Sequence, residues 1–334
     1  MISIRAMTEP VNDKYSLQPR SLEESLYATI AYFDAFNYPL TPYELWAFLL
    51  YPPDECSISE VVEKSKEHPL IEWSKGFAHM KGRSACVQER VERYVHTERK
   101  VRKAMRFSRW CSLVPGVAMI ALCNTLAFSH ARDGSDIDLL IVARKGHLWF
   151  VRAACIVLSL CFGPRLSEQH MRDALCLSFF ISEDALDLSS LALPCLQGID
   201  DVYLAIWASR LVPIYDEGGI ARSFWKANQW AAKMIPHRMP YVPSHMRRID
   251  HGVVLSTFKK SVSALYAPFH IFSDRACKVI QQKKFPSAIR TAARQAHSGV
   301  VMSDIMLKFH LNDRREYFQR HLIEHLHSYQ SRSI

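Results

Sequence analysis

The sequence predicts an α/β (α+β) protein in which a small mixed sheet is flanked by helices. Apolar runs of strand length lie at 117–122, 139–142 and 174–181, and turn residues bound each of them. Helical spacing dominates the chain before and after these runs. A length of 334 residues, with 49% hydrophobic and 22% charged residues, suits a well-packed protein of two or three domains.

The front of the chain reads as a leader, 1–20, followed by a small domain, 21–85. Helix starts are predicted where Ser21 precedes Glu24 and where Thr41, followed by proline, precedes Glu44. A third helix is expected near Ser57, and then two short strands around a turn. Three helices and a hairpin are typical of a winged helix. Its third helix carries three glutamates against two lysines, so DNA binding through it is disfavoured.

A linker helix is predicted over 86–112, where a dense basic run is partly offset by glutamates. Tyr94, Val95 and Val101 are the candidates for its packed side. Two interpretations stay open for the basic residues: a phosphate-facing helix beside a site, or a solvated connection between domains.

The central region, 113–235, contains the most informative motif of the chain. Asn124 and Thr125 form a predicted turn after the first strand, a short helix is expected over 126–130, and a bend leads into the next strand. Alternate residues of a strand share a face, so Asp136 and Asp138 lie side by side. Two such carboxylates repel each other beside a core unless a cation lies between them, and Mg²⁺ is the simplest candidate.

This motif resembles the signature of the polymerase-beta-like nucleotidyltransferase superfamily, and the front end resembles that of uncharacterised bacterial proteins with such a domain. The resemblance implies that Asp136 and Asp138 are catalytic and bind Mg²⁺. It implies that Asn124, Thr125 and Ser135 bind nucleotide phosphates. The implied reaction moves a nucleoside monophosphate from an NTP to an acceptor, and the acceptor class is open. Asn124 stands where the family usually has glycine, and asparagine tolerates the left-handed backbone well.

Members of this family usually have a third carboxylate on a later strand. The predicted strand at 174–181 contains no acid, and Asp173, just before it, is the best candidate. Cys176 or Ser178 in its place would weaken metal binding and remove a base. Two hypotheses therefore remain: an active nucleotidyltransferase, or a degenerate member that binds nucleotide, nucleic acid or protein.

The last region, 236–334, is predicted to be helical and basic. Residues 231–334 hold 17 basic and 6 acidic side chains, an excess of +11 that is larger than the net charge of +9 of the whole chain. This excess favours contact with an acidic partner, or it is a solvated helical surface.

Cysteine usage and hydropathy bear on the compartment. The nine cysteines are scattered without a Cys-x-x-Cys pair, which indicates reduced thiols in a cytoplasmic protein. The apolar stretches at 110–129 and 148–162 are broken by turn residues or too short, so no membrane span is expected.

Overall fold

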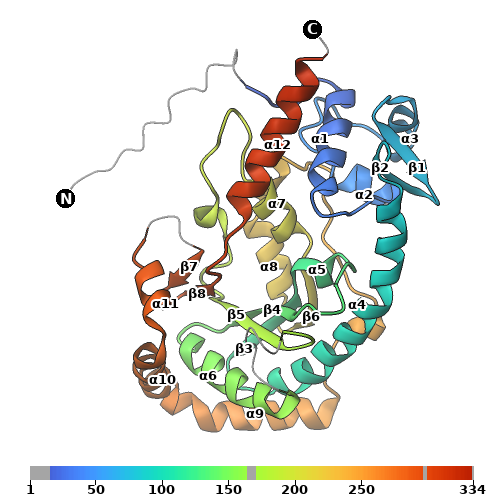
Figure 1. Cartoon of the computed structure of the whole chain (residues 1–334). Helices are drawn as coiled ribbons and strands as arrows, with labels where there is room; N and C mark the ends of the chain where they lie inside the picture. Colours follow the sequence, from blue (N-terminus) through green and yellow to red (C-terminus); the bar gives the residue numbers. More distant parts are fainter. Residues whose placement is uncertain (1–15, 164–170, 296–298, 333–334) are drawn as a thin grey trace.

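The computed structural model describes residues 16–163, 171–295 and 299–332, so most of the expected leader lies outside it. The protein is mixed α/β, with an open mixed sheet at its centre (Figure 1). The predicted fold class is confirmed at this level. The finer assignments to the nucleotidyltransferase and winged-helix folds stay predictions.

The N-terminal segment contains three helices and a hairpin, in the predicted order. Its elements are α1 (Leu22–Asp34), α2 (Pro42–Ala47), α3 (Ile58–Glu67), β1 (Ile71–Ser74) and β2 (Phe77–Met80). The predicted cap at Ser21 and the predicted helix start near Ser57 are confirmed: both serine side chains accept from the amides three residues on. Thr41 and Glu44 form a full capping box, because each side chain accepts from the other residue's amide.

These helices share their core with distant parts of the chain. Leu26 and Leu45 belong to the same buried cluster as Ile206 and Leu322. In Figure 1, α12 (Arg315–Gln330, red) runs beside α1 (blue), and α7 (Val202–Ser209) lies below them. The N-terminal segment therefore does not close a hydrophobic core of its own.

One long helix, α4 (Ala85–Cys111), follows the hairpin as predicted, but its packed side differs. Val101 is buried, whereas Val95 is 72% exposed. Arg90 and Lys100 are buried instead. The first half of the helix packs against the N-terminal segment and the second half against the central sheet, so no single apolar stripe marks its buried side.

The central sheet has the strand order β6-β3-β4-β5-β8-β7. Its strands are β3 (Val117–Leu122), β4 (Ile137–Ala143), β5 (Leu175–Ser182), β6 (Val212–Asp216), β7 (Val300–Met302) and β8 (Met306–Phe309). Among the described strands, only β4 and β5 pair in parallel; α6 (Leu148–Ser159) lies in the connection between them. Such a crossover is the usual way to join parallel neighbours.

Helices cover both faces of this sheet. On one face, Leu139 and Ile141 of β4 share a core with residues of α4 and α6. On the other, Leu140 and Val142 pack against α7 and α8 (Ile220–Ala227). Strand β4 is therefore buried on both sides, as is typical of a strand made of large aliphatic residues.

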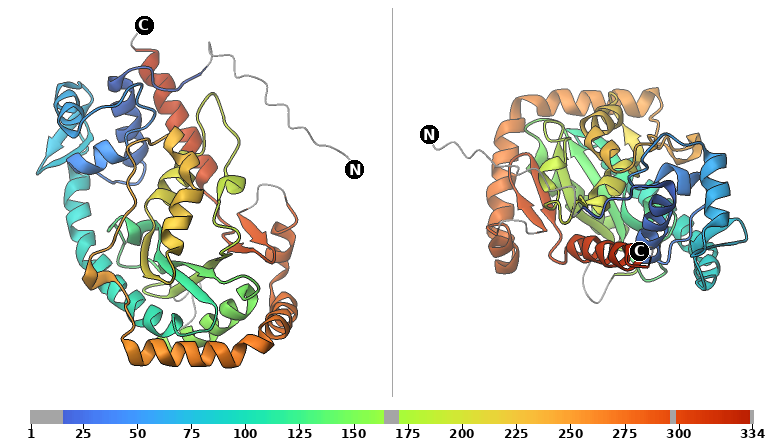
Figure 2. Two further views of the ribbon diagram at one scale, coloured as in Figure 1. Left: turned by 180° about the vertical axis from the view of Figure 1, so that it is seen from behind. Right: turned by 90° about the horizontal axis from the view of Figure 1, so that it is seen from above.

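The C-terminal region was predicted to be mostly helical, and this prediction missed the two strands within residues 300–309. Three helices, α9 (Val253–Tyr266), α10 (His270–Lys284) and α11 (Ser287–Ala292), precede β7 and β8, which extend the sheet. Strands of three and four residues are too short for a periodic signal. Figure 2 shows the molecule from behind and from above; in Figures 1 and 2, α9 and α12 lie at opposite ends of it.

In the part of the chain that the structure describes, no helix is both long and apolar enough to cross a membrane. All nine cysteines are free thiols, as their scattered positions predict.

Candidate functional site

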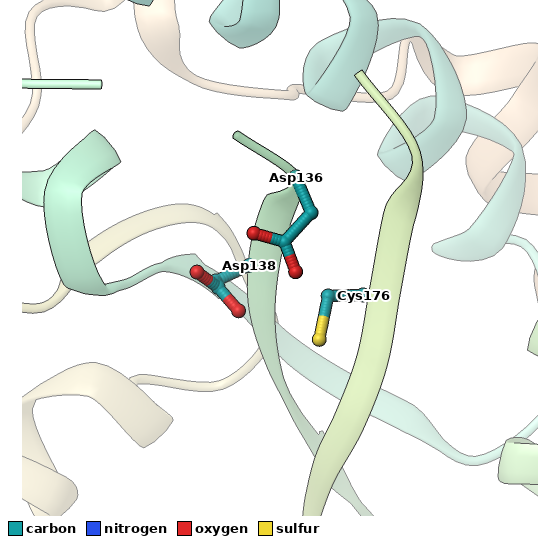
Figure 3. A group of neighbouring side chains, drawn as sticks. All are labelled: Asp136, Asp138 and Cys176. Carbon is teal, nitrogen blue, oxygen red and sulfur yellow. The ribbon is translucent and has the colours of Figure 1, made fainter. Parts of the chain in front are cut away.

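Asp136 and Asp138 lie at the start of β4, on the face of the sheet that α7 covers. Across the parallel ladder, Asp138 pairs in register with Cys176 of β5. Ligand atoms of these three side chains all lie within 4.8 Å of one another. Figure 3 shows the two carboxylates and the thiol gathered at neighbouring strands. Asp136 and Asp138 are therefore neighbours in space, and Cys176 is the third side chain of their cluster.

Burial raises the pKa of both carboxyls. The pKa of Asp138 rises to about 6, first through burial and then through the nearby charge of Asp136. Hydrogen bonds from the Asn124 side chain and the Cys176 thiol oppose this rise without cancelling it. The two negative charges thus have no full compensation from the described residues around them.

Cys176 acts as a neutral donor at this site. Burial and then the two aspartates raise the pKa of its thiol, so the sulfur keeps its proton near neutral pH. The thiol lowers the pKa of both carboxyls through its hydrogen bonds. A protonated thiol in this position adds no negative charge, unlike a third carboxylate.

The turn after β3 fixes a second donor. Asn124 has φ +51°, the left-handed conformation for which asparagine is suited. Its Oδ1 accepts from Trp207 Nε1 of α7 at 2.7 Å. Because an indole only donates, this contact assigns the oxygen to Trp207 and turns the Asn124 amide toward Asp138. Sequence reasoning found Asn124 but gave it a role toward phosphate alone.

The other two predicted phosphate-binding residues differ in availability. Thr125 is exposed in α5 (Asn124–Ala127), which is shorter and starts earlier than the expected helix. Ser135 Oγ donates to the carbonyl oxygens of Arg132 and Asp136, at 3.0 and 3.3 Å. Thr125 is therefore open to a ligand, whereas Ser135 shapes the loop that leads into Asp136.

Asp173, the candidate third acid, lies outside the cluster. Its Oδ1 accepts from Lys100 Nζ at 2.6 Å and from Arg99 Nη2 at 3.1 Å. Burial alone would raise the pKa of Asp173, but these two cations outweigh it and lower the pKa. A carboxylate held by two cations of α4 is not free to join a metal site.

Lys100 is the anchor of this region, and the sequence pattern did not single it out. Its side chain is fully buried, and Nζ also donates to the carbonyl oxygens of Asp133 and Ser135, at 2.9 and 2.6 Å. It thus ties the loop before Asp136 to the start of β5. Helix α4 lies beside the candidate site, but the Lys100 amino group donates to oxygens of the protein and is not free for a phosphate.

A hydrogen-bonded chain leads away from Cys176. Cys176 Sγ lies 3.2 Å from Ser178 Oγ, which lies 3.2 Å from His310 Nε2. Burial lowers the pKa of His310 to about 4, so the imidazole is neutral at pH 7. His310 follows β8, and only the pairing of β8 with β5 brings it here.

An apolar pocket of about 110 Å³ lies next to the turn. Asn124 and Thr125 line it together with aromatic side chains of the N-terminal helices and of α7; these are Tyr32, Phe33, Phe36, Tyr38, Tyr203 and Trp207. Aromatic walls beside a polar turn can pack a flat, partly apolar ligand.

Comparisons of the chain with models of known protein families, with curated proteins and with solved structures gave no match.

Proposed function

We propose that this protein is a Mg²⁺-dependent nucleotidyltransferase, which transfers a nucleoside monophosphate from an NTP to an acceptor. The observation that carries this proposal is the uncompensated pair Asp136 and Asp138 beside an accessible turn. Half-buried carboxylates whose charges repel are poised to bind a cation.

The donor set fits Mg²⁺ in two of its three positions. Carboxylate oxygens are hard ligands that Mg²⁺ prefers, whereas the protonated thiol of Cys176 is a poor one. Mg²⁺ commonly uses one or two protein carboxylates and takes phosphate oxygens for the rest. When bound, it would neutralise charge on the transferring phosphoryl group.

The surrounding residues have proposed roles in binding. Asn124 orients Asp138, and the Thr125 hydroxyl, which is open, meets the nucleotide phosphates. The aromatic pocket beside them would pack the nucleobase. Among the described residues the cluster has no third carboxylate, and we assign the role of proton acceptor to the neutral imidazole of His310, which is linked to Cys176 through Ser178.

The acceptor and the compartment belong to the same proposal. The basic excess of the C-terminal region, 236–334, favours an acidic acceptor or partner, whether small molecule, protein or nucleic acid. Nine free thiols suit the cytoplasm.

The second candidate function is nucleotide binding without transfer. Cys176 in the position of the third acid favours it, because the site lacks one negative charge and one strong base. Asp136 and Asp138 would then hold a nucleotide and its cation, and the bound nucleotide would control the binding of a partner.

One experiment separates the two functions. The protein is incubated with α-labelled NTPs, Mg²⁺ and cell extract, and binding of a non-hydrolysable NTP analogue is measured in parallel. We expect label transfer by the wild type, a loss of about 10³-fold or more in Asp136→Asn/Asp138→Asn, and no change in the exposed control Asp54→Asn. Mg²⁺-dependent binding without transfer would select the second function. Neither binding nor transfer would reject both.

A further inference from the structure

A second pocket, of about 390 Å³, lies between α2 and the end of α7, and two arginines line it. Arg210 follows α7 directly, and Arg238 belongs to the segment beyond α8. Thr41, Tyr43 and Tyr241 are among the other lining residues. The pocket shares no lining residue with the cluster of Asp136, Asp138 and Cys176.

Arg238 is a buried cation without an acidic partner in the described part of the chain. It is 6% exposed, and its Nη2 donates to the carbonyl oxygen of Asn228 at 3.1 Å. Its guanidinium stacks 4.9 Å from the ring of Trp225, and its buried Nε has no hydrogen-bond partner. Burial lowers the pKa of Arg238, with no carboxylate to oppose the effect.

Arg210 is held in a similar way. Its guanidinium carbon lies 4.6 Å from the ring of Tyr241 and 5.8 Å from that of Phe128. Its Nε is buried and also lacks a hydrogen-bond partner. Stacking on aromatic rings fixes the plane of a guanidinium but uses none of its N–H groups.

The acid that lines this pocket is already used. Both oxygens of Glu44 bind Arg90, at 2.9 Å, and they also accept from the hydroxyls of Tyr38 and Thr41. Arg210 and Arg238 therefore keep two positive charges that no described carboxylate offsets. Arg238 is buried and Arg210 is half-buried, and cations removed from water are costly unless they are paired, so the pocket is electrostatically incomplete.

We infer that this pocket binds the phosphate group of a small phosphorylated molecule. A phosphate monoester carries nearly two negative charges at pH 7. As a ligand for two guanidiniums it therefore balances the charge better than a ligand with one carboxylate would. The aromatic rings of Tyr43 and Tyr241 form a wall for the rest of the ligand. The inference goes beyond the proposed transfer reaction, since it needs neither Mg²⁺ nor the aspartate pair.

Titration calorimetry on the full chain tests this site, with inorganic phosphate as the probe, without Mg²⁺ and at constant ionic strength. We expect saturable binding to the wild type and an affinity about tenfold weaker or more in Arg210→Gln and in Arg238→Gln. Arg222→Gln, an exposed arginine on α8, is the matched control and should bind as the wild type does. Thermal unfolding checks that each variant is folded; if Arg238→Gln is not, Arg210→Gln decides.

Two further arms make the outcome specific. Asp136→Asn/Asp138→Asn should keep its phosphate affinity, so a failure of the transfer proposal and a failure of this one are distinguishable. Acetate should bind at least tenfold more weakly than phosphate. The inference is overturned if Arg210→Gln binds phosphate as the wild type does, if Arg222→Gln loses as much affinity, or if acetate binds equally well.

Discussion

Two pairs of aspartates lie in or near the loop that leads into β4, and they differ in whether cations of the protein pair with them. Asp133 and Asp173 are bound by cations of the protein itself: Arg99 contacts both, and Lys100 contacts Asp173. The Cys176 thiol donates to both Asp136 and Asp138, and the Asn124 amide donates to Asp138; Lys100 also lowers the pKa of Asp136, but burial outweighs it. The pKa values of the first pair are lowered, and those of the second pair are raised.

The difference shows how neighbouring acids take different roles. Asp133 and Asp173 are structural, because their charges are already paired. Asp136 and Asp138 keep charge that an external cation can meet. Arg210 and Arg238 are the mirror case, two cations left for an external anion. Unpaired charge, more than the residue type, marks the candidate sites of this protein.

The largest effect is expected when the buried cation Lys100 is removed from the pair Asp133 and Asp173. Lys100→Met takes a fully buried amino group from three acceptors and leaves Asp173 partly unpaired. We expect a loss of about 3–5 kcal/mol in the free energy of unfolding, as for other broken buried pairs. Urea denaturation measures it. Arg102→Met, at an exposed position of the same helix, should change stability by less than about 0.5 kcal/mol. Equal losses in both variants would contradict the anchor role.

A smaller effect of opposite sign is expected at the unpaired site. The folded pKa of Asp138, about 6, lies above its ordinary value of 3.8, so the folded state binds a proton more tightly than the unfolded chain. Stability is therefore lost as the pH rises from about 4 to about 6. Without divalent cations, we expect Asp138→Asn to be more stable than the wild type by about 2 kcal/mol at pH 7.

Urea unfolding in the presence of a chelator, between pH 4 and pH 8, measures this gain. The difference should shrink toward pH 4, where the wild-type carboxyl is protonated, and Mg²⁺ should favour the wild type. A variant that is less stable than the wild type at pH 7, with the chelator present, would show that the pair is not strained.

The third change sharpens the site by adding the missing charge. Cys176→Asp places a carboxylate opposite Asp138 in the ladder, and we expect Mg²⁺ affinity to rise about tenfold. Calorimetric titration with Mg²⁺ measures the change. Cys195→Asp, at an exposed cysteine, is the matched control. If affinity does not rise, the position of Cys176 is not equivalent to that of a third metal ligand.

Local signals predicted much of the fold. Side-chain caps at Ser21, Thr41 and Ser57 depend on residues three positions away, so the helix starts could be read directly. The strand at 117–122 was predicted with its observed bounds, because a continuous apolar run between turns is a strong signal. The aspartate pair was found for the same reason, since alternation within one strand fixes its geometry.

Long-range contacts could not be predicted in this way. The role of Lys100 depends on a loop more than thirty residues away, and that of His310 depends on a strand of four residues. The partner of Asp138 required the register between β4 and β5, which places Cys176, and not Asp173, beside it. Arg210 and Arg238 are informative because neither forms an ion pair with a described carboxylate, and a sequence does not show such an absence.

The order in which the chain is made has a consequence for the cell. Helix α1 packs against α12, nearly three hundred residues later, and β5 gains its outer neighbour only when β8 exists. At ribosomal speeds of about 5–20 residues per second, the apolar side of α1 waits on the order of tens of seconds for its partner. A nascent chain that has not yet reached α12 therefore leaves the apolar side of α1 without this partner, and such exposed apolar surface favours aggregation.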